Sequence, residues 1–502
     1  MNAPPVLLGP ISLDPKSEAP LYRQLYDQLR HAILDGRLPT GVRLPSSRTL
    51  AKELSVGRNT IVAAFEQLLV EGYLEARTGA GTQVAALLPE SLLEVGDGAA
   101  KPADNLSPED LLAGLSDRGR RMMGVQRVPT GYEKGQARAF QHGLPAIEQF
   151  PFGVWSRLLA RRGRAVQGRH YDYHVAAGYQ PLRDALATYL GAARGVVCKP
   201  EQIIITTGAQ AALDLAARLL VDPGDPVWIE DPGYLGARGA FFGAGADLVP
   251  VPIDREGLQI DVGLKRAPAP KLIYVTPSHQ FPTGATMSIK RRLALLETAK
   301  QTGAWILEDD YDSEYRYVGR PLPALQGLDH AGRTIYMGTL AKVLFPAVRI
   351  GYLVVPEALI EPFTIAIRLT GQIAPAFLQA ALADFITEGH FGTHIRKMRT
   401  LYAARRQLLI DALEKYGQGR LTMPETEAGM QLAAHLPDGI DDIELAKAAA
   451  RHKVHTTPLS TYYLGGPSTK DRNALYLGYA AVADTEIPRA AQRLVAALDE
   501  LS

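Results

Sequence analysis

Short apolar runs alternate with helical stretches from about residue 122 to the end of the chain. Each run has the length of a buried strand, and helical periodicity follows most of them, as in Gln210–Leu220 and Ile289–Gln301. Strands that are apolar throughout and joined by helices form a mainly parallel sheet with both faces covered. The sequence therefore predicts an α/β fold for this region. The five runs are Ile203–Thr206, Val227–Ile229, Leu272–Val275, Trp305–Leu307 and Ile335–Met337.

The length and composition of the chain bound its class. A length of 502 residues exceeds one ordinary hydrophobic core, so we expect two or three domains. Cys198 is the single cysteine, which excludes an intrachain disulfide and fits a reducing compartment. No apolar run reaches the roughly 18 residues of a membrane helix, and the N-terminus lacks a signal-peptide pattern. We expect a cytoplasmic protein that does not bind membranes.

Residues 20–86 have the pattern of three helices followed by a hairpin. Apolar residues recur every four positions over Leu21–Ile33, which predicts the first helix. A second helix starts at Pro45-Ser46-Ser47 with serine as its N-cap, and a third follows the break at Ser55-Val56-Gly57. Two short strands then surround the tip Gly79-Ala80-Gly81. This order predicts a winged helix-turn-helix. The alternative is a small helical domain with solvated arginines.

Cationic and polar residues lie where such a fold meets DNA. A recognition helix presents its N-terminal residues to base edges, while the N-terminus of the preceding helix meets phosphate. Residues 20–86 hold eight Lys and Arg against six Asp and Glu, so we expect modest non-specific affinity. The predicted DNA-binding residues are Arg43, Ser46, Ser47, Arg48, Arg58, Asn59, Thr60, Arg77 and Gly79.

The stretch LPSSRTLAKELSVGRNTIVAAFEQLLVEGYLEARTGAGTQV resembles the GntR-type winged helix, whose usual form is LPSxRxLAxxLxVSRxTVxxAYxxLxxEGxLxxxxGxGTxV. Residues 1–19 precede it as an N-terminal arm. Residues 87–121 are rich in proline and glycine and poor in apolar periodicity. We predict a linker there, with one short helix near Pro108–Leu115, and a second domain over residues 122–502.

The stretch Tyr336–Tyr352, YMGTLAKVLFPAVRIGY, contains a candidate reactive lysine. Burial of Lys342 would lower its proton affinity, and a neutral amine can form a Schiff base with a carbonyl. Arg349 can bind a phosphate through two hydrogen bonds, and the Thr339 hydroxyl can supply a further donor. Together these groups fit pyridoxal 5′-phosphate (PLP). A surface lysine in a loop is the alternative.

Three further motifs follow predicted strands, where sites in such sheets lie. Gly208-Ala209-Gln210 opens a helix, and its backbone N–H groups can hold a phosphate. Tyr234 offers an aromatic face for a pyridine ring. Asp309 can pair with a pyridine nitrogen, and Tyr311 can bond the neighbouring phenolic oxygen. The other acidic residues of this run, Asp310 and Asp312, are expected in a solvated loop.

Read together, these motifs resemble fold-type I aminotransferases, and joined to a winged helix they are similar to MocR/GabR-type transcriptional regulators. TPSHQFPTG (Thr276–Gly284) and EDDYDSEY (Glu308–Tyr315) are characteristic of that family. The resemblance implies a PLP-binding aminotransferase-like domain with a mainly parallel sheet and a small C-terminal α+β subdomain. It also implies a head-to-tail homodimer with swapped winged helices.

The resemblance assigns roles to the candidate cofactor residues. Lys342 would carry the Schiff base, Asp309 would pair with the pyridinium, and Tyr311 would bond the 3′-oxygen. Tyr234 would stack on the ring. The phosphate would be bound by Arg349, Thr339, Gly208, Ala209 and Gln210.

Three departures from the aminotransferase pattern bear on activity. Phe281 stands where an asparagine is usual, and Ala341 stands where a serine is usual. The arginine that binds a substrate carboxylate is expected within ALYLGYA, where Tyr476 appears instead. Arg472 and Arg238 are the other candidate effector contacts. Without a carboxylate clamp to orient the substrate, ligand sensing is favoured over turnover.

The resemblance implies a PLP-dependent, DNA-binding transcriptional regulator. An amine effector, or PLP itself, would react at Lys342 and change promoter binding. One alternative is an active aminotransferase with an accessory DNA-binding module, because the lysine, carboxylate and arginine for cofactor chemistry are present. Another alternative is a regulator that keeps the aminotransferase-like fold but does not bind PLP. It requires that four motifs match a PLP site by coincidence.

Overall fold

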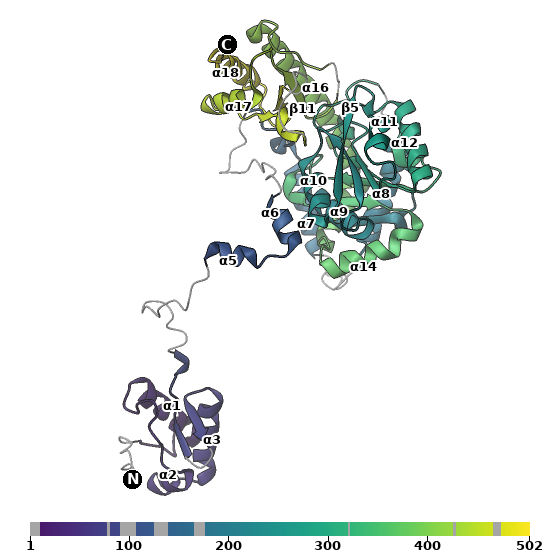
Figure 1. Ribbon diagram of the computed structural model, residues 1–502. Coiled ribbons are helices and arrows are strands. Elements are labelled where there is room, and N and C mark those ends of the chain that lie inside the picture. The colour runs from purple at the N-terminus through teal and green to yellow at the C-terminus, as the bar shows by residue number, and fades with distance from the viewer. Residues whose placement is uncertain are drawn as a thin grey trace. The chain divides into compact units, whose positions relative to one another are not determined.

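The computed structural model describes residues 11–77, 81–90, 107–124, 139–164, 176–319, 322–424, 428–464 and 473–501. The chain divides into two compact units, Met1–Gly114 and Leu115–Ser502, which are described separately below (Figure 1).

The N-terminal unit is a three-helix winged fold. Its elements are α1 (Leu21–Leu34), α2 (Ser47–Glu53), α3 (Arg58–Val70) and the antiparallel pair β1 (Leu74–Arg77) and β2 (Gly81–Val84). Ser46 caps α2, because its side chain accepts a hydrogen bond from the Thr49 N–H. Leu25, Leu50 and Ile61 come from the three helices and are fully buried in one core. The predicted winged helix-turn-helix is confirmed.

Two short helices lie in the predicted linker region. The helix α5 (Pro108–Ala113) agrees with the prediction near Pro108–Leu115, and Ser107 caps it. A second helix, α6 (Asp117–Gly124), was not predicted. It belongs to the C-terminal unit, where it packs against α10 (Leu235–Ala244).

The C-terminal unit is built on an eight-stranded sheet. The central strands β9, β8, β7, β4 and β5 are parallel, as predicted. Strand β10 runs antiparallel to both of its neighbours, which a list of apolar runs could not show. The strands in sheet order are β3 (Ile203–Thr206), β10 (Gly351–Val354), β9 (Thr334–Thr339), β8 (Trp305–Asp310), β7 (Leu272–Val275), β4 (Pro226–Asp231), β5 (Asp247–Asp254) and β6 (Gly257–Leu258).

Helices cover both faces of this sheet, because alternate residues of each strand point to opposite sides (Figure 1). Ile203 and Ile205 pack with Trp155 of α7 (Phe152–Arg164), together with α8 (Gln180–Arg194) and α15 (Ala376–Thr387). Ile204 faces the opposite side, with α9 (Ala209–Leu220), α10 and α14 (Ile360–Thr370). Burial on both faces explains why the strands are apolar throughout.

The C-terminal subdomain has its own small core. A three-stranded antiparallel sheet, in the order β11 (Gln431–His435), β13 (Ala474–Gly478) and β12 (Thr457–Pro458), packs with three helices. These helices are α16 (His390–Gly417), α17 (Asp442–Arg451) and α18 (Ile487–Asp499), and they gather at one end of the unit (Figure 1). The predicted α+β subdomain is confirmed. Among the described helices, none is long and apolar enough to cross a membrane.

Candidate cofactor site and DNA interface

A cavity of about 300 Å³ lies at the carboxyl ends of the central strands. The strand ends supply Tyr274, Thr276, Asp309 and Thr339, and the residues just beyond them supply Tyr234, Tyr311 and Lys342. The C-terminal subdomain and the segment Gln141–Leu144 close the other side. The remaining lining residues are Ala209, Leu235, Phe281, Pro346, Gln431, His455 and Tyr462.

Lys342 is half-buried in this cavity, with its Nζ donating to the Gly143 carbonyl over 2.7 Å. Burial lowers the pKa of the Lys342 amine, and the nearby carboxylates of Asp312 and Asp309 partly oppose this shift. A lowered pKa leaves more of the amine neutral, and the neutral amine is the form that attacks a carbonyl.

Asp309 is buried with one oxygen bonded and the other without a partner. Its Oδ2 accepts from the Tyr274 hydroxyl over 2.7 Å, while Oδ1 is buried and makes no hydrogen bond to the described residues. Burial raises the pKa of the Asp309 carboxyl to about 7, against the effect of the Tyr274 bond. A protonated pyridine nitrogen would supply both the missing donor and the opposite charge. The donor set therefore fits PLP.

Two tyrosines flank the space between Asp309 and Lys342. Tyr311 reaches its neighbour His279, with the hydroxyl oxygen 3.1 Å from the imidazole Nδ1. Tyr234 lies at the start of α10, and its ring centroid is 5.5 Å from that of Phe281. Burial, together with the Asp309 charge, raises the pKa of Tyr234 to about 12. Burial also raises the pKa of Tyr311, so both phenols are protonated and can donate at neutral pH.

The predicted phosphate residues divide into two groups. Gly208 has φ +106° and precedes α9 without a side-chain cap, which leaves the first N–H groups of the helix available for an anion. Ala209 and Thr339 line the cavity. Gln210 and Arg349 are absent from its lining: the Gln210 amide donates to the Gly236 carbonyl, and Arg349 is exposed.

The cavity wall includes residues that the sequence did not single out. His142 contacts the Thr457 hydroxyl over 3.1 Å and the Tyr462 hydroxyl over 3.2 Å. Burial, with the Lys342 charge, lowers the pKa of His142 to about 3, so the ring is neutral. Gln431 accepts from the Gly143 N–H over 3.2 Å. These residues lie far from the strand-end motifs in sequence, and no local pattern marks them.

The predicted effector residues do not meet in one place. Tyr476 is fully buried in β13 and lies behind the wall, with its ring centroid 5.0 Å from that of His142 and 5.4 Å from that of Phe281. Arg238 does not line the cavity, and its Nη1 is buried without a hydrogen-bond partner in the described part of the chain. Arg472 lies outside the described residues.

The prediction of a solvated acidic loop was wrong. Asp310 and Asp312 are 6% and 1% exposed, respectively. Asp310 accepts from Arg194 over 2.7 Å and from the Tyr336 hydroxyl over 2.8 Å, while Asp312 faces His279. Strand β8 carries the chain into the interior through Asp310, so these carboxylates have buried partners in place of solvent.

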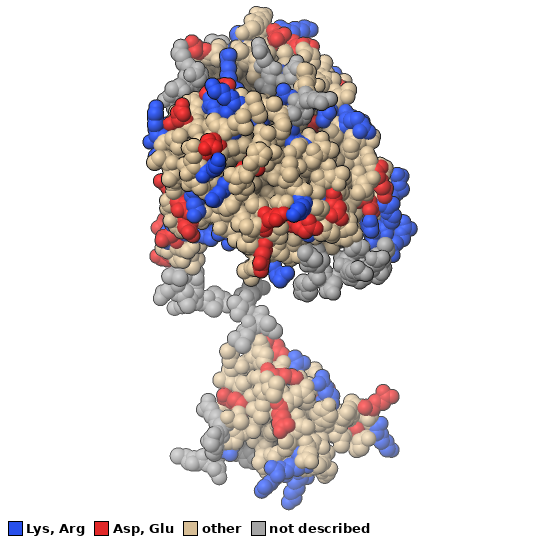
Figure 2. Space-filling model, turned by 90° about the vertical axis from the view of Figure 1, so that its right-hand side faces the viewer, with Lys and Arg blue, Asp and Glu red and all other residues tan. Residues whose placement is uncertain are grey.

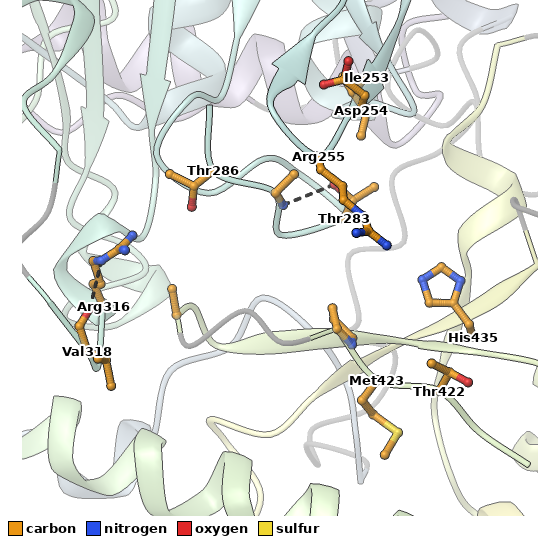
Figure 3. A pocket seen from close by; sticks show the side chains of 13 residues that line it. Ile253, Asp254, Arg255, Thr283, Thr286, Arg316, Val318, Thr422, Met423 and His435 are labelled. Carbon is orange, nitrogen blue, oxygen red and sulfur yellow. Dashed lines mark hydrogen bonds between the residues drawn. The ribbon is translucent and has the colours of Figure 1, made fainter. Parts of the chain in front are cut away.

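A second, larger cleft of about 840 Å³ opens beside this site, between the turn at Asp254-Arg255 and the C-terminal subdomain. Figure 3 shows Arg255 and His435 directed into it from its two walls. The segment Phe281–Thr286 separates the two spaces, because Phe281 lines the cofactor cavity while Thr283 and Thr286 line the cleft. No predicted site residue lies among those that line it.

The N-terminal unit presents most of the predicted DNA-binding residues to solvent. Arg43, Arg48, Arg58 and Asn59 are exposed. In the space-filling view, Lys and Arg side chains of this unit gather at its lower end (Figure 2). The Arg58 Nε donates to the Ser47 hydroxyl over 3.4 Å, joining the starts of α3 and α2. Ser46 is exposed and Ser47 and Thr60 are half-buried, whereas Gly79 and the Arg77 side chain lie outside the described part.

Comparison with known proteins supports both units. Residues 21–84 match the family of bacterial regulatory proteins of the gntR type, and residues 159–494 match aminotransferase class I and II. The probable rhizopine catabolism regulatory protein MocR of Rhizobium meliloti is 45% identical over 94% of this chain and 92% of its own length. The pyridoxine biosynthesis transcriptional regulator PdxR of Corynebacterium glutamicum is 32% identical over 94% of each chain.

Solved structures of aminotransferases resemble the C-terminal unit. LysN of Thermus thermophilus, complexed with N-(5′-phosphopyridoxyl)-L-leucine, has a TM-score of 0.69 and 30% identity over 76% of this chain and 97% of its own. The kynurenine aminotransferase of Pyrococcus horikoshii, in complex with PMP, has a TM-score of 0.70 and 29% identity over 78% and 98%. PLP is therefore the cofactor that this fold and donor set share. The chain belongs to the MocR/PdxR-type transcriptional regulators, in which a GntR-type DNA-binding domain precedes a PLP-dependent, aminotransferase-like domain.

Proposed function

We propose that this regulator senses a small amine at the PLP site and changes its affinity for promoter DNA in response. PLP supplies an aldehyde that condenses reversibly with amines. The observation that carries the proposal is that a half-buried lysine shares its cavity with an Asp309 carboxylate oxygen that has no hydrogen-bond partner among the described residues. An amine that replaces Lys342 as the partner of PLP would release the lysine side chain. The lysine-bound and amine-bound states would then differ in their contacts at the cavity wall.

The residues of this chain divide the binding work among them. Asp309 would hold the ring nitrogen in its protonated form, and Tyr311 would donate to the 3′-oxygen. Tyr234 would support the ring. The N–H groups at Gly208 and Ala209 would bind the phosphate with the Thr339 hydroxyl. Arg349 and Gln210, the remaining predicted phosphate residues, do not line the cavity.

The cavity wall favours an amine without an acidic group. Lys342 is the one lysine or arginine among the described lining residues, and of the two histidines there, His142 is neutral. A carboxylate or sulfonate would enter this space without an arginine to bind it, and burying an unpaired anion is costly. Gln431, Tyr462 and His142 instead offer neutral donors and acceptors. We expect amines that carry hydrogen-bonding groups but no acidic group to bind more tightly than ordinary α-amino acids.

The proposal includes a homodimer that reads two half-sites. Exposed apolar side chains on the C-terminal unit, such as Leu369 at 81% and Phe377 at 42% exposure, suit a face covered by a second copy. On DNA, Arg58, Asn59 and Thr60 would meet base edges. The backbone would be met by Arg43, Arg48, the N-cap Ser46 and its neighbour Ser47. Arg77 and Gly79 would contact the DNA from the wing.

The experiment combines a visible spectrum with a DNA-binding assay on the full-length protein. Amines of differing charge are titrated into the PLP-loaded protein while the cofactor band and the affinity for DNA upstream of the neighbouring genes are recorded. The proposal expects one class of amine to change both signals together. Lys342→Ala serves as the control, because it lacks the exchangeable link. A spectral change with constant DNA affinity for every amine would refute the coupling.

Catalytic transamination is the second candidate function. It is favoured by the presence of both Lys342 and Asp309 in the cavity and by the likeness to LysN. Sustained formation of keto acid or aldehyde over many turnovers, abolished in Lys342→Ala, would support it. A single stoichiometric reaction without product release supports sensing instead.

A further inference from the structure

The notable feature outside the roles assigned above is a buried histidine behind the cofactor tyrosine. His279, in TPSHQFPTG, is 5% exposed and faces Asp312, in EDDYDSEY, which is 1% exposed. Both oxygens of Asp312 approach the imidazole Nδ1, at 3.1 and 3.0 Å. The Tyr311 hydroxyl oxygen lies 3.1 Å from the same nitrogen. Three oxygen atoms therefore converge on one ring nitrogen.

Counting protons at this nitrogen fixes the direction of each hydrogen bond. An ionised carboxylate can only accept, so Nδ1 must carry the hydrogen that faces Asp312. The Tyr311 oxygen is within reach of the same N–H and accepts from it together with the carboxylate oxygens. The Tyr311 hydroxyl hydrogen cannot also point at Nδ1. It is directed away from His279, and Tyr311 lines the cofactor cavity.

Cationic groups around the pair oppose the effect of burial on the Asp312 carboxyl, although its pKa remains raised. Burial raises the pKa of the Asp312 carboxyl, and the facing imidazole opposes that shift, as does Lys342. Asp310 repels the charge of Asp312 from one side. Asp309 and Lys342 lie on the cavity side of the pair, and Tyr311 both lines the cavity and contacts His279. Three guanidinium groups, those of Arg194, Arg292 and Arg316, line a small void shared with Asp312 and His279.

The backbone holds the imidazole in place. Gly429 has φ +88°, and a Cβ built there would lie 2.1 Å from the His279 Cε1. No side chain other than that of glycine fits beneath the ring. The Gly429 carbonyl is itself held by the Tyr479 hydroxyl over 2.9 Å, and its N–H donates to the Tyr315 carbonyl over 2.8 Å. The backbone of the C-terminal subdomain at Gly429 therefore packs directly against the imidazole ring.

We propose that His279, held by Asp312 and Gly429, is a positioning residue that makes Tyr311 donate its hydroxyl hydrogen to the 3′-oxygen of PLP. Through this chain of contacts, Asp312 and the C-terminal subdomain act on the cofactor without touching it. The inference depends on PLP binding at this site and is independent of the identity of the effector. It also gives the two motifs that mark this family a shared physical role.

The test uses the pH midpoint of the visible absorbance of the PLP-loaded, full-length protein. A donor at the 3′-oxygen draws negative charge away from the nitrogen that joins PLP to Lys342, so that nitrogen holds its proton less tightly. Tyr311→Phe should therefore raise the midpoint by about one pH unit, which corresponds to about 1.4 kcal/mol. His279→Leu should raise it by a similar amount, because the Tyr311 hydroxyl is then free to turn to Asp312.

A double variant and a conservative variant separate this role from a general structural one. The double variant Tyr311→Phe with His279→Leu should show no larger shift than Tyr311→Phe alone, because both changes remove the same bond. His279→Asn keeps an N–H near the Nδ1 position and should leave the midpoint near that of the wild type. If His279→Leu fails to fold, His279→Gln should raise the midpoint in the same way, because its amide lies one carbon further along the side chain than the amide of asparagine. Additive shifts in the double variant, or an unshifted midpoint in both His279→Leu and His279→Gln, would overturn the proposal.

Discussion

Asp310→Ala should destabilise the C-terminal unit strongly, because it leaves a buried guanidinium without its counter-charge. The side chains of Arg194 and Asp310 are 3% and 1% exposed and are joined over 2.7 Å. Removing Asp310 costs one charge-assisted bond, worth about 1.5–3 kcal/mol, and the acceptor of the Tyr336 hydroxyl, worth about 1 kcal/mol more. Arg194 keeps its bond to the Ser278 hydroxyl. We expect a loss of about 3 kcal/mol in the free energy of unfolding, which is at the lower end of the losses measured when one partner of a buried ion pair is removed.

Tryptophan fluorescence during urea unfolding measures this loss in the C-terminal unit alone, because Trp155, Trp228 and Trp305 are the three tryptophans of the chain. A matched control is Glu357→Ala, which removes an exposed ion pair with Lys199 and should leave the unfolding midpoint unchanged. A double variant, Arg194→Met with Asp310→Leu, should recover most of the lost stability, since it leaves no buried charge unpaired. An Asp310→Ala protein that unfolds at the wild-type urea concentration would refute the reasoning.

Three further predictions concern the cofactor, the DNA and the pH dependence of stability. Asp309→Asn replaces a charge-assisted bond by a neutral one and should weaken PLP binding by about 10- to 100-fold, which a cofactor titration followed by absorbance would measure. Arg58→Ala should lower DNA affinity. The affinities of Arg58→Ala and Arg48→Ala are compared at several salt concentrations. Loss of a phosphate contact reduces the slope of log affinity against log salt by about 1, so the comparison distinguishes a base contact from a phosphate contact. Burial alone would raise the pKa of Asp310, but Arg194 outweighs it and holds that pKa below its ordinary value. The stability contributed by Asp310 is therefore present above a pH of about 4 and is lost as the pH falls through its lowered pKa. Urea midpoints measured at successive pH values would show this loss. The double variant Asp310→Leu with Arg194→Met should not show it.

The sequence predicts the parts of the fold that depend on local patterns. Continuous apolar runs such as Ile203–Thr206 are strands because both faces of the sheet are covered, and Ser46 caps α2 as its position indicates. The reversed direction of β10 depends on its pairing with β3 and β9, which lie far apart in sequence. No periodicity within one segment records such a pairing.

The candidate site was predictable where a motif follows a strand and was missed elsewhere. Lys342, Asp309 and Tyr311 meet in one cavity because the carboxyl ends of parallel strands share an edge. His142 and Gln431 come from other parts of the chain, and tertiary packing alone brings them to Lys342. Asp312 was misplaced because acidic runs are commonly solvated, and its partner His279 lies 33 residues earlier.

Operator affinity and the cofactor spectrum should be measured in the same titration of an amine that carries no acidic group. For the wild-type protein, we expect the visible band and the DNA affinity to change at the same amine concentration, with a change in affinity of about 5- to 150-fold. Lys342→Ala should show neither change. A wild-type protein whose band responds to amines while its DNA affinity stays constant, or a Lys342→Ala protein whose affinity still responds, would contradict the claim that this regulator senses amines through its PLP site.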